Sequence, residues 1–113
     1  MEIKFVPYSG YLMGLPTTEN HLVFRYIGEG KILFSVTRQG DAASCHFASD
    51  KKGLKSVKTA CDEFVKFCFW LFPWCKMCLA HIKPGGIARM IERIEFALIG
   101  ETTKGLVYAR LRP

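Results

Sequence analysis

The stretch from Ser49 to Phe96, with the strand that leads into it, most constrains the fold of this chain because it fixes the order of its elements. The pattern predicts a strand, a lysine-rich turn with a glycine, a long amphipathic helix, a second strand and a second helix. The first helix runs from about Leu54 to Phe72, with apolar residues at three- and four-residue steps, and Pro73 ends it. The second strand is predicted over Lys76 to Ile82 and the second helix over Gly85 to Phe96.

The turn that opens the first helix has the chemistry of an anion site. It reads Ser49-Asp50-Lys51-Lys52-Gly53-Leu54-Lys55-Ser56, and Lys58 follows one turn later. The first turn of a helix carries unpaired backbone N–H groups and the positive end of the helix dipole. Exposed cations at that end each cost about 0.3–1 kcal/mol, so a group of lysines there favours a bound anion such as a phosphate. The alternative is an ordinary solvated turn in which Ser49 or Asp50 caps the helix.

The remaining segments predict strands, because apolar and polar residues alternate in them. The 113 residues are expected to form one domain, residues 1–113, of the α+β class. A segment rich in turn-forming residues, Tyr8 to Glu19, separates the first two strands. The expected strands are Ile3 to Val6, a meander of His21 to Ile27, Lys31 to Arg38 and Ala42 to Ala48, and a final hairpin from Ala97 to Leu111 that turns around Thr102 to Gly105.

Composition indicates a globular protein, since half of the residues are apolar and 13% are aromatic. The net charge of +6 favours an acidic or phosphorylated partner. The N-terminal residues lack the pattern of an export signal. The most apolar window, Phe64 to Leu79, is interrupted by Lys66, Pro73 and Lys76 and falls short of the ~20 residues that a membrane span requires. We therefore expect a cytoplasmic protein without a membrane segment.

Five cysteines, an odd number, fit a reducing compartment better than a disulfide framework. Cys61 and Cys68 fall on the apolar face of the first predicted helix, at positions seven residues apart. A free cysteine in such a place behaves as a small hydrophobic residue. These two thiols are therefore expected to belong to the core.

Cys75 and Cys78 form a Cys-x-x-Cys pair. In redox proteins such a pair opens a helix, whose dipole lowers the pKa of the thiol. Here the pair follows a helix and enters a strand, which disfavours a redox function. Zinc binding by this pair with His46 or His81 is a second alternative, but the sequence lacks a second Cys-x-x-Cys pair or a spaced histidine pair. We therefore expect no metal.

Two features of the chain resemble the GNAT superfamily of acyl-CoA-dependent N-acyltransferases. The first is the order of elements from His21 onward. The second is the segment Gly86-Ile87-Ala88-Arg89-Met90-Ile91-Glu92-Arg93-Ile94-Glu95-Phe96-Ala97-Leu98-Ile99-Gly100-Glu101. The resemblance implies a central, mixed, mostly antiparallel sheet of six or seven strands with two main helices. It also implies an activity: transfer of an acetyl group from acetyl-CoA to an amine of a small molecule or protein.

The same resemblance implies a set of site residues. His46, on the strand before the basic turn, would be the base that deprotonates the amine. Tyr108 would supply the acid for the departing thiolate, if the final hairpin folds over the cleft. The strand from Cys78 to Ile82 would pair with the pantetheine arm through Cys78 and Ala80. The pyrophosphate would lie on the basic turn, at Lys51, Lys52, Gly53, Leu54, Lys55 and Ser56.

The sequence departs from the family pattern at several of these places. Ile91 stands where many members have the tyrosine that acts as general acid, and Glu95 replaces the glycine of a Gly-Phe pair. The glycine of the basic turn is displaced; an alternative register puts Asp50 first and Lys55 last. The segment from Tyr8 to Glu19 is too short for the two helices of full members. The shortened N-terminal region resembles that of small phage-encoded proteins of GNAT-like fold. This resemblance implies an alternative: a degenerate, non-catalytic member that binds a protein in head assembly, in the virion or in the host.

Two further partner classes follow from the surface residues. Nucleic acid is disfavoured, because the lysines of the turn accompany no recognised nucleic-acid motif. An aromatic cluster at the end of the first helix spreads over more than one helix face, which predicts either cover on two sides or an oligomer contact. Of these two we expect the contact of a homodimer. The cluster consists of Phe67, Phe69, Trp70, Phe72 and Trp74.

Overall fold

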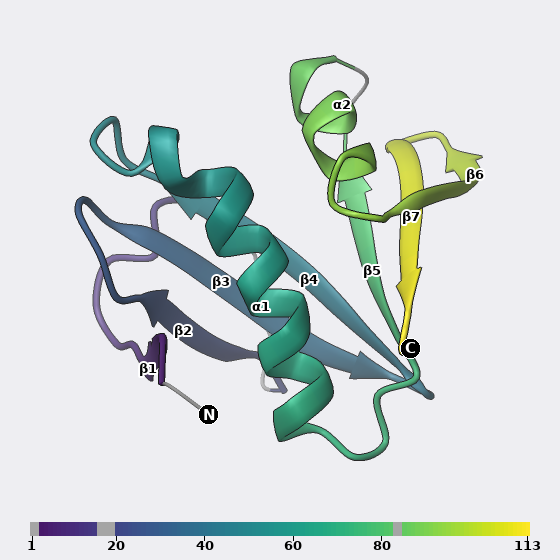
Figure 1. Cartoon of the computed structure of the whole chain (residues 1–113), viewed down its shortest axis with the longest axis horizontal. Helices are drawn as coiled ribbons and strands as arrows, with labels where there is room; N and C mark the ends of the chain where they lie inside the picture. The colour runs from purple at the N-terminus through teal and green to yellow at the C-terminus, as the bar shows by residue number, and fades with distance from the viewer. Residues whose placement is uncertain (1–2, 16–19, 83–84) are drawn as a thin grey trace.

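One seven-stranded sheet runs through the computed structural model, and two helices lie against it (Figure 1). The structure describes residues 3–15, 20–82 and 85–113. The strand order in the sheet is β1-β2-β3-β4-β5-β7-β6. The elements are β1 (Phe5–Pro7), β2 (Leu22–Tyr26), β3 (Ile32–Gln39), β4 (Ala42–Ser49), the 3-10 turn η1 (Leu54–Ser56), α1 (Val57–Leu71), β5 (Met77–Ile82), α2 (Gly86–Glu92), β6 (Ala97–Thr102) and β7 (Gly105–Leu111).

This arrangement confirms the predicted α+β class and the mixed, mostly antiparallel sheet. β4 and β5 pair in parallel, and the other neighbouring strands pair antiparallel. The predicted strands lie within two residues of the observed ones. Tight turns join the meander β2-β3-β4, and Gly30 and Gly40 in these turns have φ angles of +74° and +64°. Such angles favour glycine, which has no Cβ to clash with the backbone.

The core lies between α1 and the face of the sheet that α1 crosses. Phe64 of α1 stacks on Phe34 of β3 with ring centroids 4.4 Å apart and ring planes 13° apart. Phe5 and Phe24 extend this aromatic layer toward the edge of the sheet. Burial of each such ring contributes about 1.5–3 kcal/mol to stability. The residues of α1 that are buried are those of the predicted apolar stripe: Val57, Ala60, Cys61, Phe64, Val65, Cys68 and Phe69.

Both helices are shorter than the sequence predicts. The α-helical part of α1 begins at Val57, after η1, and ends at Leu71, because Phe72 is already extended before Pro73. The prediction that the second helix extends to Phe96 is wrong, since α2 ends at Glu92. Glu95 has a φ of +70°, a left-handed conformation that a helix cannot contain.

The aromatic cluster at the end of α1 is covered mainly by the chain itself. Phe67 packs on Phe5 and Phe24, with ring centroids 5.0 and 5.1 Å apart. Phe72 stacks on Trp74 at 4.9 Å, and the guanidinium groups of Arg38 and Arg112 lie over the rings of Trp74 and Phe69. Trp70 stays 57% exposed. The first of the two alternatives, cover on two sides, therefore accounts for most of the cluster, and the homodimer remains a prediction.

Within the described residues between β1 and β2, residues 8–15 and 20–21 form no helix. This agrees with the predicted shortening of the N-terminal helical region. Residues 16–19 of the predicted turn-rich segment and Pro84, expected to lead into the second helix, lie outside the described residues. No helix among the described residues has the length and apolarity that crossing a membrane requires.

Candidate functional site

β4 and β5 separate along their length and leave a gap in the sheet (Figure 1). The parallel register pairs Ala42 with Met77 at one end and Cys45 with Ala80 at the other, where it stops. Both strands continue beyond that point, β4 to Ser49 and β5 to Ile82. The second half of each strand therefore borders an open wedge rather than its neighbour.

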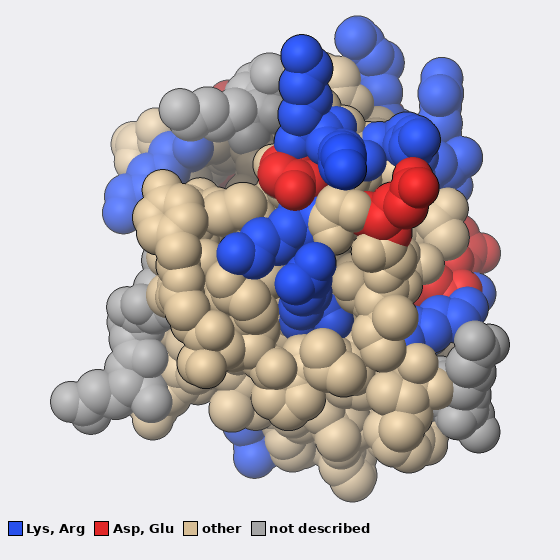
Figure 2. Space-filling model, turned by 90° about the vertical axis from the view of Figure 1, so that its left-hand side faces the viewer, with Lys and Arg blue, Asp and Glu red and all other residues tan. Residues whose placement is uncertain are grey.

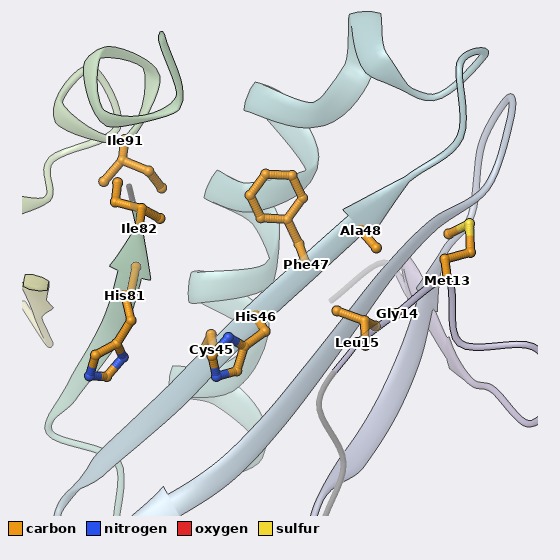
Figure 3. Close-up of a pocket in the computed structure, with 11 residues that line it drawn as sticks. Met13, Gly14, Leu15, Cys45, His46, Phe47, Ala48, His81, Ile82 and Ile91 are labelled. Carbon is orange, nitrogen blue, oxygen red and sulfur yellow. The ribbon is translucent and has the colours of Figure 1, made fainter. Parts of the chain in front are cut away.

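A cleft of about 200 Å³ lies at this gap (Figure 3). The two imidazole rings of the cleft, from β4 and β5, face the space between the strands in Figure 3. β4 and β5 form two walls of the cleft. The segment before β2 forms a third wall, and α2 contributes one residue, Ile91. The lining residues are Met13, Gly14, Leu15, Cys45, His46, Phe47, Ala48, Ala80, His81, Ile82 and Ile91.

A cavity lies on each face of the sheet at this gap. A second, smaller cavity of about 40 Å³ lies on the α1 side, where Phe64, Val65 and Phe96 line it. The two cavities have five lining residues in common: Cys45, His46, Phe47, Ala80 and Ile91. The same residues of the gap therefore border both cavities.

One edge of β5 is open along the gap. On its far side, His81 and Ile82 pair with Val107 and Leu106 of β7. On the near side, pairing with β4 ends at Ala80. An extended ligand can hydrogen-bond to such an edge in the way that an added strand does. The structure thus brings the predicted residue Ala80 to the cleft, whereas the predicted residue Cys78 is fully buried beneath it, in the paired part of the strand.

His46 lies in the cleft, as predicted, and beside a second histidine. Its ring centroid is 6.3 Å from that of His81, and the two rings are within 17° of parallel (Figure 3). Burial lowers the pKa of His46 below 6.5, and the neighbouring His81 and His21 lower this pKa further. A neutral imidazole at this position can accept a proton. Sequence reasoning gave His81 only a metal-binding role. Two strands separated by a helix imply that the strands are parallel, but not the register that places His81 beside His46.

The basic turn lies immediately beyond the cleft, where β4 ends. In Figure 2, which faces the side of the molecule that carries this turn, lysine and arginine side chains gather along the upper edge with acidic side chains between them. Lys51, Lys52, Leu54 and Lys55 are exposed, and Ser56 is half-buried. Lys55 forms an exposed ion pair with Glu29 at 3.4 Å. The turn is therefore an accessible, positively charged rim.

Gly53 in this turn is buried and does not face solvent. A Cβ on Gly53 would lie 2.5 Å from Ser49 Oγ and 2.7 Å from Ile32 Cγ1, so close packing requires glycine here. Its N–H donates to Asp50 Oδ1 at 2.8 Å, and Lys31 N–H donates to the same oxygen at 3.0 Å. These two hydrogen bonds hold the pKa of Asp50 below 3.8. The Gly53 N–H, which sequence reasoning assigned to a phosphate, is occupied by a carboxylate.

An open groove of about 460 Å³ leads along the helices beside the gap. Lys58, Thr59 and Asp62 of α1 form one wall, and Arg93, Ile94 and Glu95 after α2 form the other. Asp62 also pairs with Arg110 of β7, with Oδ1 2.6 Å from the guanidinium. The groove thus offers one cation from α1, Lys58, and one from the segment after α2, Arg93.

Tyr108 is buried on β7 and is absent from the lining of the cavities described above. Its hydroxyl donates to Glu92 Oε2 at 2.7 Å, at the end of α2. This hydrogen bond raises the pKa of Tyr108, and burial raises it further. Ile91, one residue before Glu92, lines both cavities but carries no proton donor. The described residues therefore place no tyrosine hydroxyl at the gap.

Comparison with known proteins places the fold. No protein-family model and no curated protein matches the sequence. Among solved structures, the spermidine N-acetyltransferase of Vibrio cholerae matches with a TM-score of 0.66 at 11% identity, over 82% of this chain and 66% of that one. The N-acetyltransferase PseH of Campylobacter jejuni, in complex with acetyl coenzyme A, matches with a TM-score of 0.68 at 10% identity, over 85% and 71% of the two chains.

An aminoglycoside acetyltransferase in complex with coenzyme A also matches, with a TM-score of 0.65 at 14% identity, over 83% of this chain and 68% of that one. The chain therefore has the fold of the GNAT N-acetyltransferases, which confirms the resemblance seen in the sequence. It spans about two thirds of the length of these structures. At such low identity the likeness shows the fold alone.

Proposed function

We propose that this chain is an N-acyltransferase that transfers an acetyl group from acetyl-CoA to an amine. The observation that carries the proposal is the gap between β4 and β5, with cavities on both faces and an open edge on β5. Two of the structures that share this fold contain acetyl coenzyme A or coenzyme A. A gap with a cavity on each face allows the two substrates to meet from opposite sides.

Acetyl-CoA would enter from the α1 side. Its pantetheine arm is extended and can pair with the open edge of β5 beyond Ala80. Its phosphates would lie at the exposed rim, where the side chains of Lys51, Lys52 and Lys55 supply the charge. Because Asp50 occupies the Gly53 N–H, we assign phosphate binding to lysine side chains more than to the backbone. Cations of this kind act as point charges toward phosphate.

The amine would enter from the other face, where His46 and His81 line the larger cleft. The amine nitrogen attacks the carbonyl carbon of the thioester, the C–S bond breaks, and an amide and CoA are formed. His46 is the candidate base that accepts the proton of the amine. Holding the two reactants in contact supplies much of the rate enhancement in such a reaction.

Ile91 lines the cleft at the sequence position of the family's tyrosine and has no proton to donate. The departing group is a thiolate, whose conjugate acid has a pKa of about 8.5 in the case of cysteine. Such a group leaves at neutral pH without full protonation. We therefore propose a mechanism that relies on positioning and on His46, with Tyr108 in a structural role through Glu92.

The second candidate function is a binding module of GNAT fold without catalysis. Two observations favour it: Ile91 at the position of the acid and Asp50 on the N–H of the basic turn. Its partner would be a protein, with phage head assembly, the virion or a host factor as the predicted settings. Phage origin and cytoplasmic location remain predictions from the sequence.

Thermal unfolding with acetyl-CoA separates the two functions. A ligand that binds only the folded state at 100 times its Kd stabilises by about 2.7 kcal/mol, so we expect Tm to rise by several degrees. Lys52→Glu should abolish the rise, and the matched control Lys104→Glu, exposed in the β6–β7 turn, should retain it. The absence of any rise at millimolar acetyl-CoA would overturn the acyltransferase. A rise without acetylation of a polyamine, an aminoglycoside or a peptide amine would favour the binding module.

A further inference from the structure

Three cysteines that are distant in the sequence meet in the core at the point where β4 and β5 part. Cys45 comes from β4, Cys68 from α1 and Cys78 from β5, and their sulfur atoms all lie within 4.8 Å of one another. Cys68 and Cys78 are fully buried, and Cys45 is half-buried. We call these three residues the cysteine cluster.

The cluster has a ligand set that suits soft metal ions. Thiolates select Zn²⁺, Cu(I) and iron–sulfur centres over hard cations such as Mg²⁺ and Ca²⁺. Three convergent thiols from three elements provide a trigonal face, which a d¹⁰ ion without geometric preference accepts. A disulfide would use two of the three sulfur atoms, whereas a metal ion would use all of them.

The cluster is accessible to an ion despite its burial. Cys45 lines the larger cleft and also the smaller cavity on the α1 side. An ion can therefore approach the cluster through the gap, and a fourth coordination position would point toward it. Zinc sites with three protein ligands keep such a position for water or another small ligand.

A fourth thiol stands close to the cluster in the chain. Cys75 lies three residues before Cys78 and is also buried, and its thiol donates to the Met77 carbonyl oxygen at 3.2 Å. The guanidinium of Arg112 donates to the carbonyl oxygens of Cys75, Phe69 and Phe72. It thereby holds the loop that precedes β5 against the end of α1.

We propose that Cys45, Cys68 and Cys78 bind one thiophilic d¹⁰ cation, Zn²⁺ or Cu(I), which ties α1, β4 and β5 together at the apex of the gap. This site shares Cys78 with the zinc site weighed in the sequence, but that site used Cys75 and His46 or His81 in place of Cys45 and Cys68. The proposal also departs from the expectation of no metal. Since β4 and β5 share only the pairs from Ala42–Met77 to Cys45–Ala80, the ion would hold the two strands between the Ala43–Cys78 pair and the last pair, Cys45–Ala80. The proposal is independent of acyl transfer.

The direct test is metal binding by the unmodified protein. The reduced, chelator-treated chain is incubated with Zn²⁺ alone and, separately, with Cu(I) alone, and native mass spectrometry counts the bound ions. We expect one ion per chain. Each metal-loaded protein is then treated with a chelator, and the ion that the protein retains is the one that the site prefers. Failure of both ions to bind to the folded chain would overturn the proposal.

Variants locate the site. Cys68→Ser and Cys78→Ser should each lose the ion, whereas Cys61→Ser, a buried cysteine of α1 outside the cluster, should retain it. With Co²⁺ as a spectroscopic probe, the native protein should show a sulfur-to-metal charge-transfer band that Cys45→Ser lacks. Tm should rise with Zn²⁺ in the native protein and in Cys61→Ser. Equal loss of the ion in Cys61→Ser and Cys68→Ser would contradict a site at these three residues.

Discussion

The carboxylate of Asp50 accepts the backbone N–H of Gly53 at 2.8 Å, inside the turn that links β4 to α1. The same oxygen accepts the N–H of Lys31 at 3.0 Å and so ties the turn to β3. An internal anion thus occupies the place where an external phosphate would be expected. The hydrogen bonds that stabilise the turn therefore also reduce its capacity to bind an external anion.

Replacement of Asp50 separates these two effects. Asp50→Asn keeps an oxygen that accepts both hydrogen bonds and removes one negative charge from the rim. We expect the Kd for acetyl-CoA to fall several-fold, as measured by calorimetric titration, and Tm to fall slightly in thermal unfolding, because the charge that strengthens the two hydrogen bonds is lost. Asp50→Ala removes the hydrogen bonds as well and should lower Tm. An unchanged Kd in Asp50→Asn would show that phosphates do not approach this turn.

Acid should destabilise the protein partly through Asp50. Hydrogen bonds from Lys31 and Gly53 lower the pKa of this carboxyl below its ordinary value of 3.8. A group whose pKa is depressed in the folded state binds fewer protons there, so its contribution to stability is complete above about pH 4 and is lost as the pH falls through the folded pKa.

Urea denaturation between pH 6 and pH 3 measures this contribution. The free energy of unfolding should fall more steeply with acidification in the native protein than in Asp50→Asn. Asp62 adds to the slope in both proteins, because Arg110 and Lys66 lower its pKa despite the opposing effect of burial. Identical slopes in the two proteins would mean that the hydrogen bonds of Asp50 do not persist in solution.

Much of the fold could be predicted because its elements follow simple periodicities. Alternation identified the meander, and the apolar stripe that Pro73 ends identified α1. The end of α2 could not be predicted in this way. Ile94 and Phe96 continue the apolar pattern and are buried, but the left-handed backbone at Glu95 places them after the helix. Periodicity reports which residues are buried, not the turn that buries them.

The candidate site was predictable in part. His46 was selected from the sequence because it lies on the strand before the basic turn. This strand, β4, borders the gap, so His46 lines the cleft. The gap itself depends on where the pairing of β4 and β5 stops, which no local pattern encodes. The cysteine cluster was missed for the same reason, because spacing along the chain does not reveal sulfur atoms brought together from three elements.

The stack of Phe64 on Phe34 should make a large contribution to the free energy of unfolding. Phe64 is 2% exposed and contacts several other rings, so Phe64→Ala removes a large buried side chain and leaves a cavity. We expect a loss of roughly 3–5 kcal/mol in the free energy of unfolding, measured by urea denaturation. Trp70→Ala, at a position that is 57% exposed, is the matched control and should change stability by about 0.5 kcal/mol or less. A large loss in Trp70→Ala would instead indicate that this surface is covered, as in a homodimer.

His46→Gln tests the candidate base. The glutamine has a similar size but cannot accept the proton of the amine, so kcat should fall by about 10²- to 10⁴-fold. Acetyl-CoA should still raise Tm, because His46 is not assigned to phosphate or pantetheine binding. Steady-state kinetics with a polyamine or aminoglycoside acceptor measure the first quantity, and thermal unfolding measures the second. An unchanged kcat would remove His46 from the mechanism and leave positioning as its basis.

Tyr108→Phe decides between a structural role and the acid role that the sequence suggested. The buried hydroxyl donates to Glu92 Oε2 at 2.7 Å and fastens β7 to the end of α2, so its removal should lower Tm. Because the hydroxyl lies outside the described lining of the cleft, kcat should stay unchanged at temperatures well below Tm. Glu92→Gln, which keeps an acceptor for the same hydroxyl, is the control and should lower Tm less than Tyr108→Phe. A large fall in kcat with an unchanged Tm would restore Tyr108 as the acid, and would require that β7 reaches the departing thiolate when acetyl-CoA is bound.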